Sequence, residues 1–177
     1  MNYLESFSDI TTFIFDVDGV MTNSELIIME NGQLLRKMNV RDGYGIKRAL
    51  AAGYNVCVIT GGKSAGVVQR LKALGIRDIH AGIEDKLDAF EEYIYTYDID
   101  PGNVLYMGDD MPDYLPMRRV LMPVCPADAA PEIIKIAKYI SPLKGGKGCV
   151  RDVIEKVMRV QLKWETENKS VEELESD

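Results

Sequence analysis

The chain has 177 residues, of which 46% are apolar and 28% are charged, a composition typical of one globular domain with an ordinary core. Its net charge of −7 disfavours nucleic acid as a partner, and no apolar run approaches the roughly 20 residues that cross a bilayer. The three cysteines match no zinc motif, and the N-terminus lacks a signal-peptide pattern. We therefore expect a cytoplasmic protein with no nucleic-acid or membrane partner, formed by a single domain over 1–164 and an acidic, frayed tail over 165–177.

Short apolar runs alternate with helical patterns along most of the chain. The apolar runs predict strands over 12–17, 55–59, 78–80, 104–107 and 121–124. The helical patterns predict helices over 44–52, 64–74, 86–97, 131–137 and 150–164. Because this alternation is typical of βαβ units, we predict an α/β fold with a Rossmann-like, mostly parallel sheet and helices on both faces.

A different pattern follows the first predicted strand. Residues 25–29 and 33–39 are strand-like, and they are joined through Asn31-Gly32, a dipeptide that strongly favours a tight hairpin turn. The two runs predict a β-hairpin close to the carboxyl end of the first strand.

Acidic residues follow two of the predicted strands. Asp16 and Asp18 come two residues apart after the first strand, and Asp109, Asp110 and Asp113 follow the fourth. Because the carboxyl ends of parallel strands share one edge of the sheet, we expect these carboxylates to lie close together. Carboxylates in that place suggest a Mg²⁺ site, a nucleophile, or both.

Two further polar groups fall at the same edge. Thr60 and Gly61 end the second predicted strand, and Lys86 opens the helix after the third. A hydroxyl and exposed backbone N–H groups bind phosphate oxygens, and an ammonium group offsets their charge.

In this order the motifs resemble those of the haloacid dehalogenase (HAD) superfamily phosphatases: 16–19, Thr60, Lys86 and 108–113. The resemblance implies that Asp16 is the nucleophile, which forms an aspartyl-phosphate, and that Asp18 is the general acid and base. It also implies that Thr60, Gly61 and Lys86 bind the phosphoryl oxygens.

The same resemblance implies a magnesium cofactor. Asp16, Asp109 and the backbone carbonyl of Asp18 would hold the ion, with Asp110 and Asp113 supporting it from nearby. A phosphate-accepting receiver domain is an alternative, since it also gathers aspartates, a threonine and a lysine at strand ends. In a receiver the lysine comes last, whereas here an acidic cluster follows Lys86. A non-catalytic relative that serves as a binding subunit is a third possibility.

The intervals between the motifs leave room for the hairpin but not for a cap domain. An uncapped site excludes water poorly and orients a small sugar phosphate weakly. We therefore expect a neighbouring subunit to act as the lid, in a homo-oligomer that is most simply a tetramer.

A finer resemblance rests on residues 16–22, 40–46, 59–61 and 145–152. These stretches are similar to those of the phosphatases that act on 3-deoxy-D-manno-octulosonate 8-phosphate and on nonulosonate 9-phosphates. The resemblance implies a sugar-acid phosphate as substrate, with the octulosonate of lipopolysaccharide synthesis as the first expectation.

The substrate-contacting residues are expected to be Asp42, Lys147 and Arg151, although a flexible surface loop explains the glycine-rich stretch around Lys147 equally well. Gly62 stands where many octulosonate phosphatases have arginine, so the nonulosonate (KDN or N-acetylneuraminate) alternative stays open.

Overall fold

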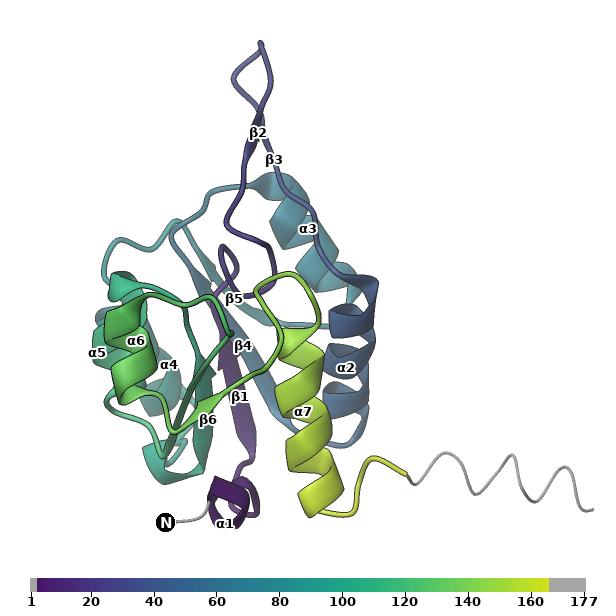
Figure 1. Cartoon of the computed structure of the whole chain (residues 1–177), viewed down its shortest axis with the longest axis vertical. Coiled ribbons are helices and arrows are strands. Elements are labelled where there is room, and N and C mark those ends of the chain that lie inside the picture. The colour runs from purple at the N-terminus through teal and green to yellow at the C-terminus, as the bar shows by residue number, and fades with distance from the viewer. Residues whose placement is uncertain (1–2, 166–177) are drawn as a thin grey trace, which may run out of the picture.

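The computed structural model describes residues 3–165, so the predicted tail lies outside the described residues except for Glu165. One parallel sheet carries helices on both faces, and a hairpin projects beyond it (Figure 1). The sheet strands are β1 (Thr12–Phe15), β4 (Asn55–Thr60), β5 (Asp78–Ala81), β6 (Val104–Met107), β7 (Met122–Cys125) and β8 (Tyr139–Ile140). The hairpin strands are β2 (Ile27–Ile28) and β3 (Leu34–Leu35). The α-helices are α1 (Tyr3–Phe7), α2 (Val40–Ala51), α3 (Ala65–Ala73), α4 (Lys86–Thr96), α5 (Tyr114–Met117), α6 (Pro131–Ile136) and α7 (Cys149–Val160), with 3₁₀ turns η1 (Pro101–Asn103) and η2 (Met111–Asp113).

The order of the sheet is β5-β4-β1-β6-β7-β8, and every neighbouring pair is parallel. From β1 the chain builds outward through β4 and β5, and then crosses to the other side to add β6, β7 and β8. The direction of winding therefore reverses between β1 and β6. Doubly wound sheets bind ligands at such a switch point, outside the carboxyl ends of the strands. The predicted α/β fold with a parallel sheet and a hairpin is confirmed.

The central strand β1 separates two layers of core. Phe13 and Phe15 face the layer formed by α1, α2, α3 and α7, whereas Ile14 faces the layer formed by α4, α5 and α6. All three side chains are completely buried. This alternation follows from the two-residue period of a strand, and burial on both faces explains why the sequence of β1 is apolar throughout.

Helix α2 begins at Val40, four residues before the predicted start. Asn39 precedes it, and the Asn39 side chain accepts a hydrogen bond from the Arg41 N–H at 2.8 Å, as a helix N-cap does. Gly43, just before the predicted start, has a low helix propensity, yet the helix includes it. Gly45 permits close packing of α2 on α7, since a Cβ there would lie 3.2 Å from the Arg151 Cα, tighter than an ordinary contact.

The segment after α7 returns to pack on α2. Trp164 is 8% exposed, and its ring contacts the Tyr44 ring edge-on at 6.2 Å between centroids. The Arg48 guanidinium lies 5.0 Å from the Trp164 ring and donates a hydrogen bond of 2.6 Å to the Trp164 carbonyl. Residues 161–165 thus belong to the folded domain, although the predicted helix over 150–164 ends at Val160.

The elements that the sequence did not reveal are the short ones. Helices α1 and α5 and strand β8 have at most five residues each, too few to show a helical or strand period. In the described part of the chain, no helix combines the length and the apolar character needed to cross a membrane.

Candidate active site

A cavity of about 380 Å³ opens at the carboxyl ends of β1, β4 and β6. Eight residues that the sequence singled out line it: Asp16, Asp18, Thr60, Gly61, Lys86, Asp109, Asp110 and Asp113. Its remaining lining residues are Ser24, Gly62, Ile83, Glu84 and Pro112. The predicted acids, hydroxyl and cation therefore share one space at the switch point of the sheet.

Lys86 stands between two buried carboxylates. Its Nζ lies 2.9 Å from Asp16 Oδ1 and donates a hydrogen bond of 2.8 Å to Asp113 Oδ1. Asp16 and Lys86 are each 6% exposed, and Asp113 is fully buried. Asp85 fixes the start of α4 by accepting hydrogen bonds from the Leu87 and Asp88 N–H groups, which makes Lys86 the first residue of the helix. The cation is therefore placed by a helix cap and held by two charge-assisted contacts.

Tyr106 is a residue of this site that the sequence analysis missed. It lies in β6, and its hydroxyl donates a hydrogen bond of 3.0 Å to Asp113 Oδ1, beside Lys86. The other carboxylate oxygen, Asp113 Oδ2, accepts from the Asp109 N–H at 3.2 Å. Both oxygens of Asp113 are thus fixed. The available signal was a phenol in an otherwise apolar buried strand, because a buried tyrosine hydroxyl requires a partner.

Two glycines allow the carboxylates to approach the backbone. A Cβ on Gly19, whose φ is +91°, would lie 1.9 Å from Asp109 Oδ2, and a Cβ on Gly108 would lie 2.3 Å from the Asp113 Cβ. No side chain fits in either place, so both acidic motifs need glycine for a steric reason.

The buried charges shift one another's pKa values. Burial, together with the Asp113 charge, raises the pKa of Asp16 from 3.8 to about 8 despite the opposing effect of Lys86. Burial and the charges of Asp113 and Asp110 raise the pKa of Asp109 to about 7. For Lys86, burial lowers the pKa, but the charges of Asp16 and Asp113 outweigh burial and raise it overall. The site gathers more carboxyl groups than its one buried ammonium group can balance, and their raised pKa values follow from burial and from that excess.

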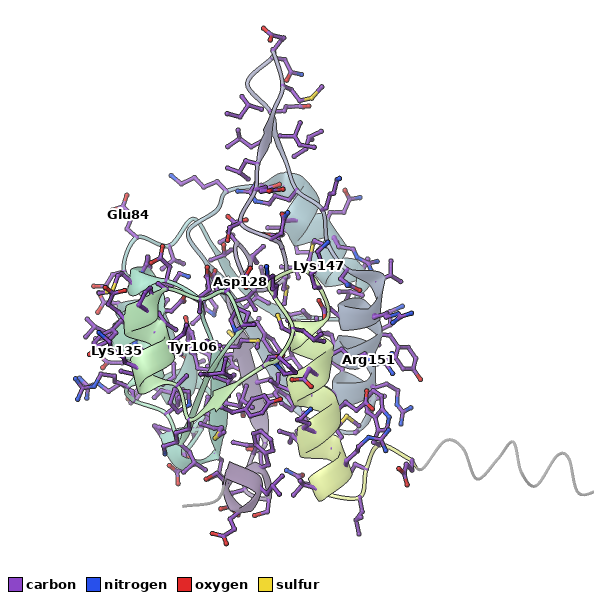
Figure 2. The ribbon with its side chains drawn as sticks, viewed as in Figure 1. Glu84, Tyr106, Asp128, Lys135, Lys147 and Arg151 are labelled. Atoms are coloured by element: carbon purple, nitrogen blue, oxygen red, sulfur yellow. The ribbon has the colours of Figure 1, made fainter. Side chains whose placement is uncertain are left out.

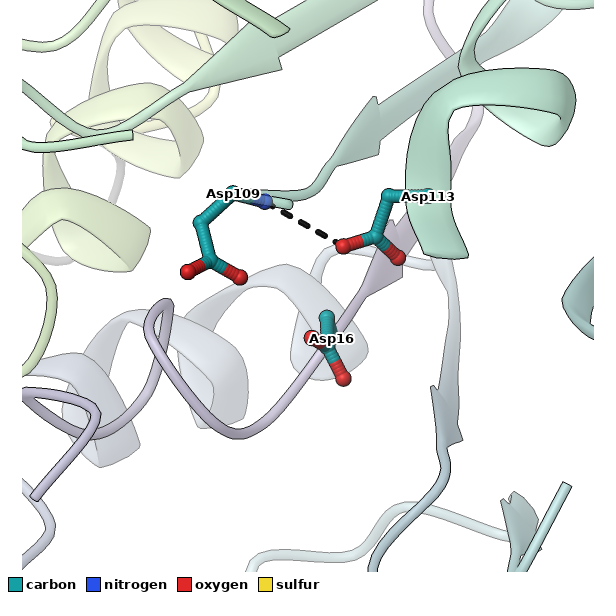
Figure 3. A group of neighbouring side chains, drawn as sticks. All are labelled: Asp16, Asp109 and Asp113. Atoms are coloured by element: carbon teal, nitrogen blue, oxygen red, sulfur yellow. Dashed lines mark hydrogen bonds between the residues drawn. The ribbon is translucent and has the colours of Figure 1, made fainter. Parts of the chain in front are cut away.

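Three of these carboxylates fit a divalent cation. One oxygen from each of Asp16, Asp109 and Asp113 lies within 4.8 Å of the other two, and Figure 3 shows the three side chains as neighbours. Oxygens that share a Mg²⁺ at about 2.1 Å are about 3–4 Å apart, so small side-chain movements bring the set into range. Hard oxygen donors with excess negative charge are the ligands that Mg²⁺ prefers. Asp110 lies at the rim, where it accepts a hydrogen bond from the Met111 N–H at 2.8 Å and caps η2.

Thr60 and the turn after it face the same cavity from the end of β4. The Thr60 side chain is buried, and its Oγ1 accepts a hydrogen bond from the Gly62 N–H at 3.1 Å. An accepting hydroxyl oxygen leaves its own hydrogen free to point at a ligand. Gly61 is exposed, so its backbone can approach a phosphoryl group closely.

Asp18 has a partner that the sequence analysis did not identify. Arg36 follows β3 and donates two hydrogen bonds to the Asp18 carboxylate, from Nε to Oδ1 at 2.6 Å and from Nη2 to Oδ2 at 3.1 Å. The Asp18 side chain remains 37% exposed at the cavity. The two carboxylates of the Asp-x-Asp motif therefore have different cations as partners.

The three expected substrate residues lie outside this cavity. Lys147 and Arg151 line a separate cavity of about 610 Å³ along α7, and Figure 2 shows both on that side of the molecule. The Arg151 guanidinium lies 5.2 Å from the rings of both Tyr44 and Trp164, and its Nε bonds Glu155 at 3.1 Å. Within the described chain, none of the three expected residues joins the Asp16 cluster.

Asp42 serves the packing of two helices. It is 3% exposed, and its Oδ1 accepts a hydrogen bond from the Arg151 N–H at 2.8 Å. Burial raises the pKa of Asp42 to about 6, although the backbone N–H groups at the start of α7 oppose the rise. A carboxylate from α2 thus satisfies the N-terminus of α7. A substrate role for Asp42, Lys147 and Arg151 stays a prediction.

Comparison with known proteins shows similarity over most of the chain. The chain is 40% identical over 153 residues to the 3-deoxy-D-manno-octulosonate 8-phosphate phosphatase of Escherichia coli K12, a match that covers 86% of this chain and 81% of that protein. The fold matches the phosphatase of the same name from Moraxella catarrhalis, solved with magnesium, phosphate and KDO, with a TM-score of 0.92 and 29% identity over 97% of this chain and 99% of that one. It also matches a HAD superfamily hydrolase of subfamily III A from Legionella pneumophila, with a TM-score of 0.89 and 33% identity over 92% of this chain and 89% of that one. No protein-family model matches the chain.

Proposed function

Because the chain belongs to the 3-deoxy-D-manno-octulosonate 8-phosphate phosphatases of the HAD superfamily, we propose that it hydrolyses the phosphate ester of that eight-carbon sugar acid. The protein is a phosphoric monoester hydrolase that uses magnesium. The observation that carries the proposal is the shared cavity in which Asp16, Asp18, Thr60, Lys86 and Asp109 all lie. Family membership leaves the receiver-domain alternative without support.

In the first half of the reaction, an Asp16 oxygen attacks the phosphorus atom and the bond from phosphorus to the sugar oxygen breaks. Asp18 gives a proton to the departing oxygen, which leaves as the alcohol of the free sugar acid. The product on the enzyme is an aspartyl-phosphate at Asp16. The Lys86 ammonium lies 2.9 Å from Asp16 and offsets the repulsion between the carboxylate and the phosphate dianion.

In the second half, a water molecule attacks the phosphorus atom and Asp18 takes its proton. The bond between Asp16 and phosphorus breaks, and inorganic phosphate leaves. The Thr60 hydroxyl and the N–H groups of the following turn bind the phosphoryl oxygens in both halves. Asp16, Asp109 and the backbone carbonyl of Asp18 would hold Mg²⁺, with Asp110 and Asp113 nearby, and the ion would supply positive charge against the phosphoryl group.

The sugar acid itself is tested by comparing substrates. We expect kcat/KM to be highest for 3-deoxy-D-manno-octulosonate 8-phosphate and lower for nonulosonate 9-phosphates, with EDTA stopping turnover and Mg²⁺ restoring it. A preference for the nine-carbon substrates would replace the octulosonate proposal by its alternative. Weak turnover of both would remove the sugar-acid proposal while leaving the phosphatase chemistry in place.

The β2–β3 hairpin supports the proposal that the chain forms a homo-oligomer, with four copies as the expected state. Ile27, Ile28, Leu34 and Leu35 are 43–75% exposed on a two-stranded element that projects from the sheet. An isolated hairpin of this kind is marginally stable in water, and an exposed apolar patch marks a contact surface. Light scattering should give about four times the 19.8 kDa mass of the chain, and a mass near one chain would remove the intersubunit lid. All three cysteines are buried free thiols, which supports the proposed cytoplasmic location.

A further inference from the structure

Arg36 behaves differently from its neighbours in the hairpin. Its side chain is 7% exposed, while Leu34 and Leu35 just before it are 43% and 44% exposed. The guanidinium points inward and donates hydrogen bonds to both oxygens of Asp18, and its Nη1 also donates to the Leu34 carbonyl at 3.4 Å. A bidentate ion pair between Arg36 and Asp18 therefore attaches one end of the hairpin to the active site.

Gly62 provides the space for this contact. A Cβ at position 62 would lie 3.4 Å from both Arg36 Nη2 and Asp18 Oδ2. That distance is van der Waals contact, so position 62 directly adjoins the Arg36–Asp18 pair. The glycine in the phosphate-binding turn and the arginine in the hairpin are therefore parts of one arrangement.

The pair determines where the Asp18 carboxylate points. Asp18 comes after β1 and is only partly buried, so the sheet does not fix its rotamer in the way that burial fixes Asp16. Two parallel N–H···O bonds from a planar guanidinium define both the position and the plane of a carboxylate. A single ammonium group would supply the charge but not the plane.

We propose that Arg36 is a positioning residue that orients Asp18 for proton transfer, which makes the hairpin a working part of the active site. The inference rests on the proposed role of Asp18 as the acid and base of the phosphatase reaction. Phosphoryl binding belongs to Thr60, Gly61 and Lys86, so Arg36 acts on the rate of the reaction and not on phosphate affinity. Reactions that need a group in one orientation lose about 100-fold when it moves by about 1 Å.

The test is Arg36→Met in the full chain with Mg²⁺ and 3-deoxy-D-manno-octulosonate 8-phosphate. We expect kcat to fall about 10- to 100-fold, while KM and the inhibition constant of inorganic phosphate stay within about twofold of the wild type. Arg36→Lys should recover part of the loss, because lysine restores the positive charge but not the two parallel hydrogen bonds of the guanidinium. The matched control is Lys37→Met, which removes an exposed cation from the same hairpin and should leave kcat unchanged.

Three outcomes would overturn the inference: wild-type kcat in Arg36→Met, a parallel rise in the phosphate inhibition constant, or an equal loss in Lys37→Met. The second result would make Arg36 a substrate contact, and the third would assign the effect to the hairpin charge as a whole. If Arg36→Met misfolds, the same readouts in Arg36→Lys decide the matter. Asp16→Asn separates this inference from the proposed function, since turnover by that variant would refute the phosphatase mechanism whatever Arg36 does.

Discussion

The two carboxylates of the Asp-x-Asp motif lie two residues apart and are held by different parts of the fold. Asp16 is 6% exposed and contacts Lys86, the first residue of α4, at the edge of the sheet. The Asp18 side chain is 37% exposed and is held by Arg36 of the hairpin. The sheet and α4 thus hold the proposed nucleophile, whereas the proposed proton-transfer group is held by the hairpin. Both proposed roles need a fixed carboxylate, and the fold supplies it twice: by burial against Lys86 for Asp16 and by the Arg36 pair for Asp18.

The largest effect is expected where the buried carboxylate is neutralised. Asp16→Asn should lower kcat by about 10⁴-fold or more because it removes the proposed nucleophile, whereas Asp18→Asn should cost about 10²- to 10⁴-fold, the range for general acid–base groups. Burial raises the pKa of Asp16 to about 8, so a neutral amide there should leave the fold intact. Steady-state assays with circular dichroism measure both effects. Near-normal turnover by Asp16→Asn would end the assignment of the nucleophile.

Removing the cation from the buried cluster should be the next largest effect. Lys86→Met should lower kcat by about 10²- to 10³-fold, since the transferring group loses a fixed positive charge. It should also lower the free energy of unfolding by about 3 kcal/mol, the lower end for breaking a buried ion pair, because Asp16 can take up a proton.

Urea unfolding and kcat measure the two losses, and substitution of the exposed Lys135 on α6, Lys135→Met, serves as the charge-matched control. Equal behaviour of the two lysine variants would show that the buried position of Lys86 has no special effect.

The stability of the fold and its affinity for Mg²⁺ should both depend on pH through the buried acidic cluster. The pKa values of Asp16 and Asp109 are about 8 and about 7 in the metal-free fold, against 3.8 when exposed. The folded state then binds more protons, so this contribution to stability is full below about pH 4 and is lost as pH rises through 7 to 8. Mg²⁺ needs the deprotonated carboxylates, so its affinity should rise by up to about tenfold per pH unit over that range.

Calorimetric titration with Mg²⁺ at pH 6 and pH 8 tests this directly. We expect weaker binding at pH 6 and a net release of protons, visible as a heat that depends on the buffer. Binding that is equally tight at both values would show that the carboxylates are already ionised in the metal-free protein.

The smallest effect on stability and rate is expected from removing the Tyr106 hydroxyl, which bonds Asp113 in the acidic cluster. Tyr106→Phe removes one of the hydrogen bonds to Asp113 Oδ1 while the Lys86 contact remains. The free energy of unfolding should fall by about 1–2 kcal/mol, and kcat by less than about tenfold. Tyr97→Phe is the matched control, because the Tyr97 hydroxyl makes a similar bond to Asp78 on the exposed surface. A loss of stability in the control that equals the loss in Tyr106→Phe would contradict the role of burial.

The same contrast explains what could be predicted from the sequence. The strands were recognisable as apolar runs, and Asp16, Thr60 and Asp109 stood out because each polar residue lies at or just beyond the end of such a run. Parallel strands place their carboxyl ends together, so the grouping of these residues follows from the topology alone. The location of the buried cluster was therefore within reach of sequence reasoning.

The Asp18 contact was not predictable in that way. Arg36 lies 18 residues from Asp18, in a hairpin whose strands are two residues long and shorter than the runs 25–29 and 33–39 suggested. Nothing in the local pattern distinguishes Arg36 from Lys37, since register and twist decide which side chain turns inward. Tyr106 was missed for a related reason: its partner Asp113 belongs to a different element, so only the packed structure shows why a phenol is buried there.

The docking of Trp164 on α2 has a practical consequence for all of these measurements. Trp164 is the single tryptophan of the sequence, it is nearly buried among the guanidinium groups of Arg48, Arg151 and Arg159, and it lies outside the lining of the catalytic cavity. Its fluorescence therefore reports from one known indole, without overlapping signals from others. Separation of α7 from α2 would expose that ring to water and shift its emission, so unfolding of every carboxylate and lysine variant can be followed optically with an unaltered probe.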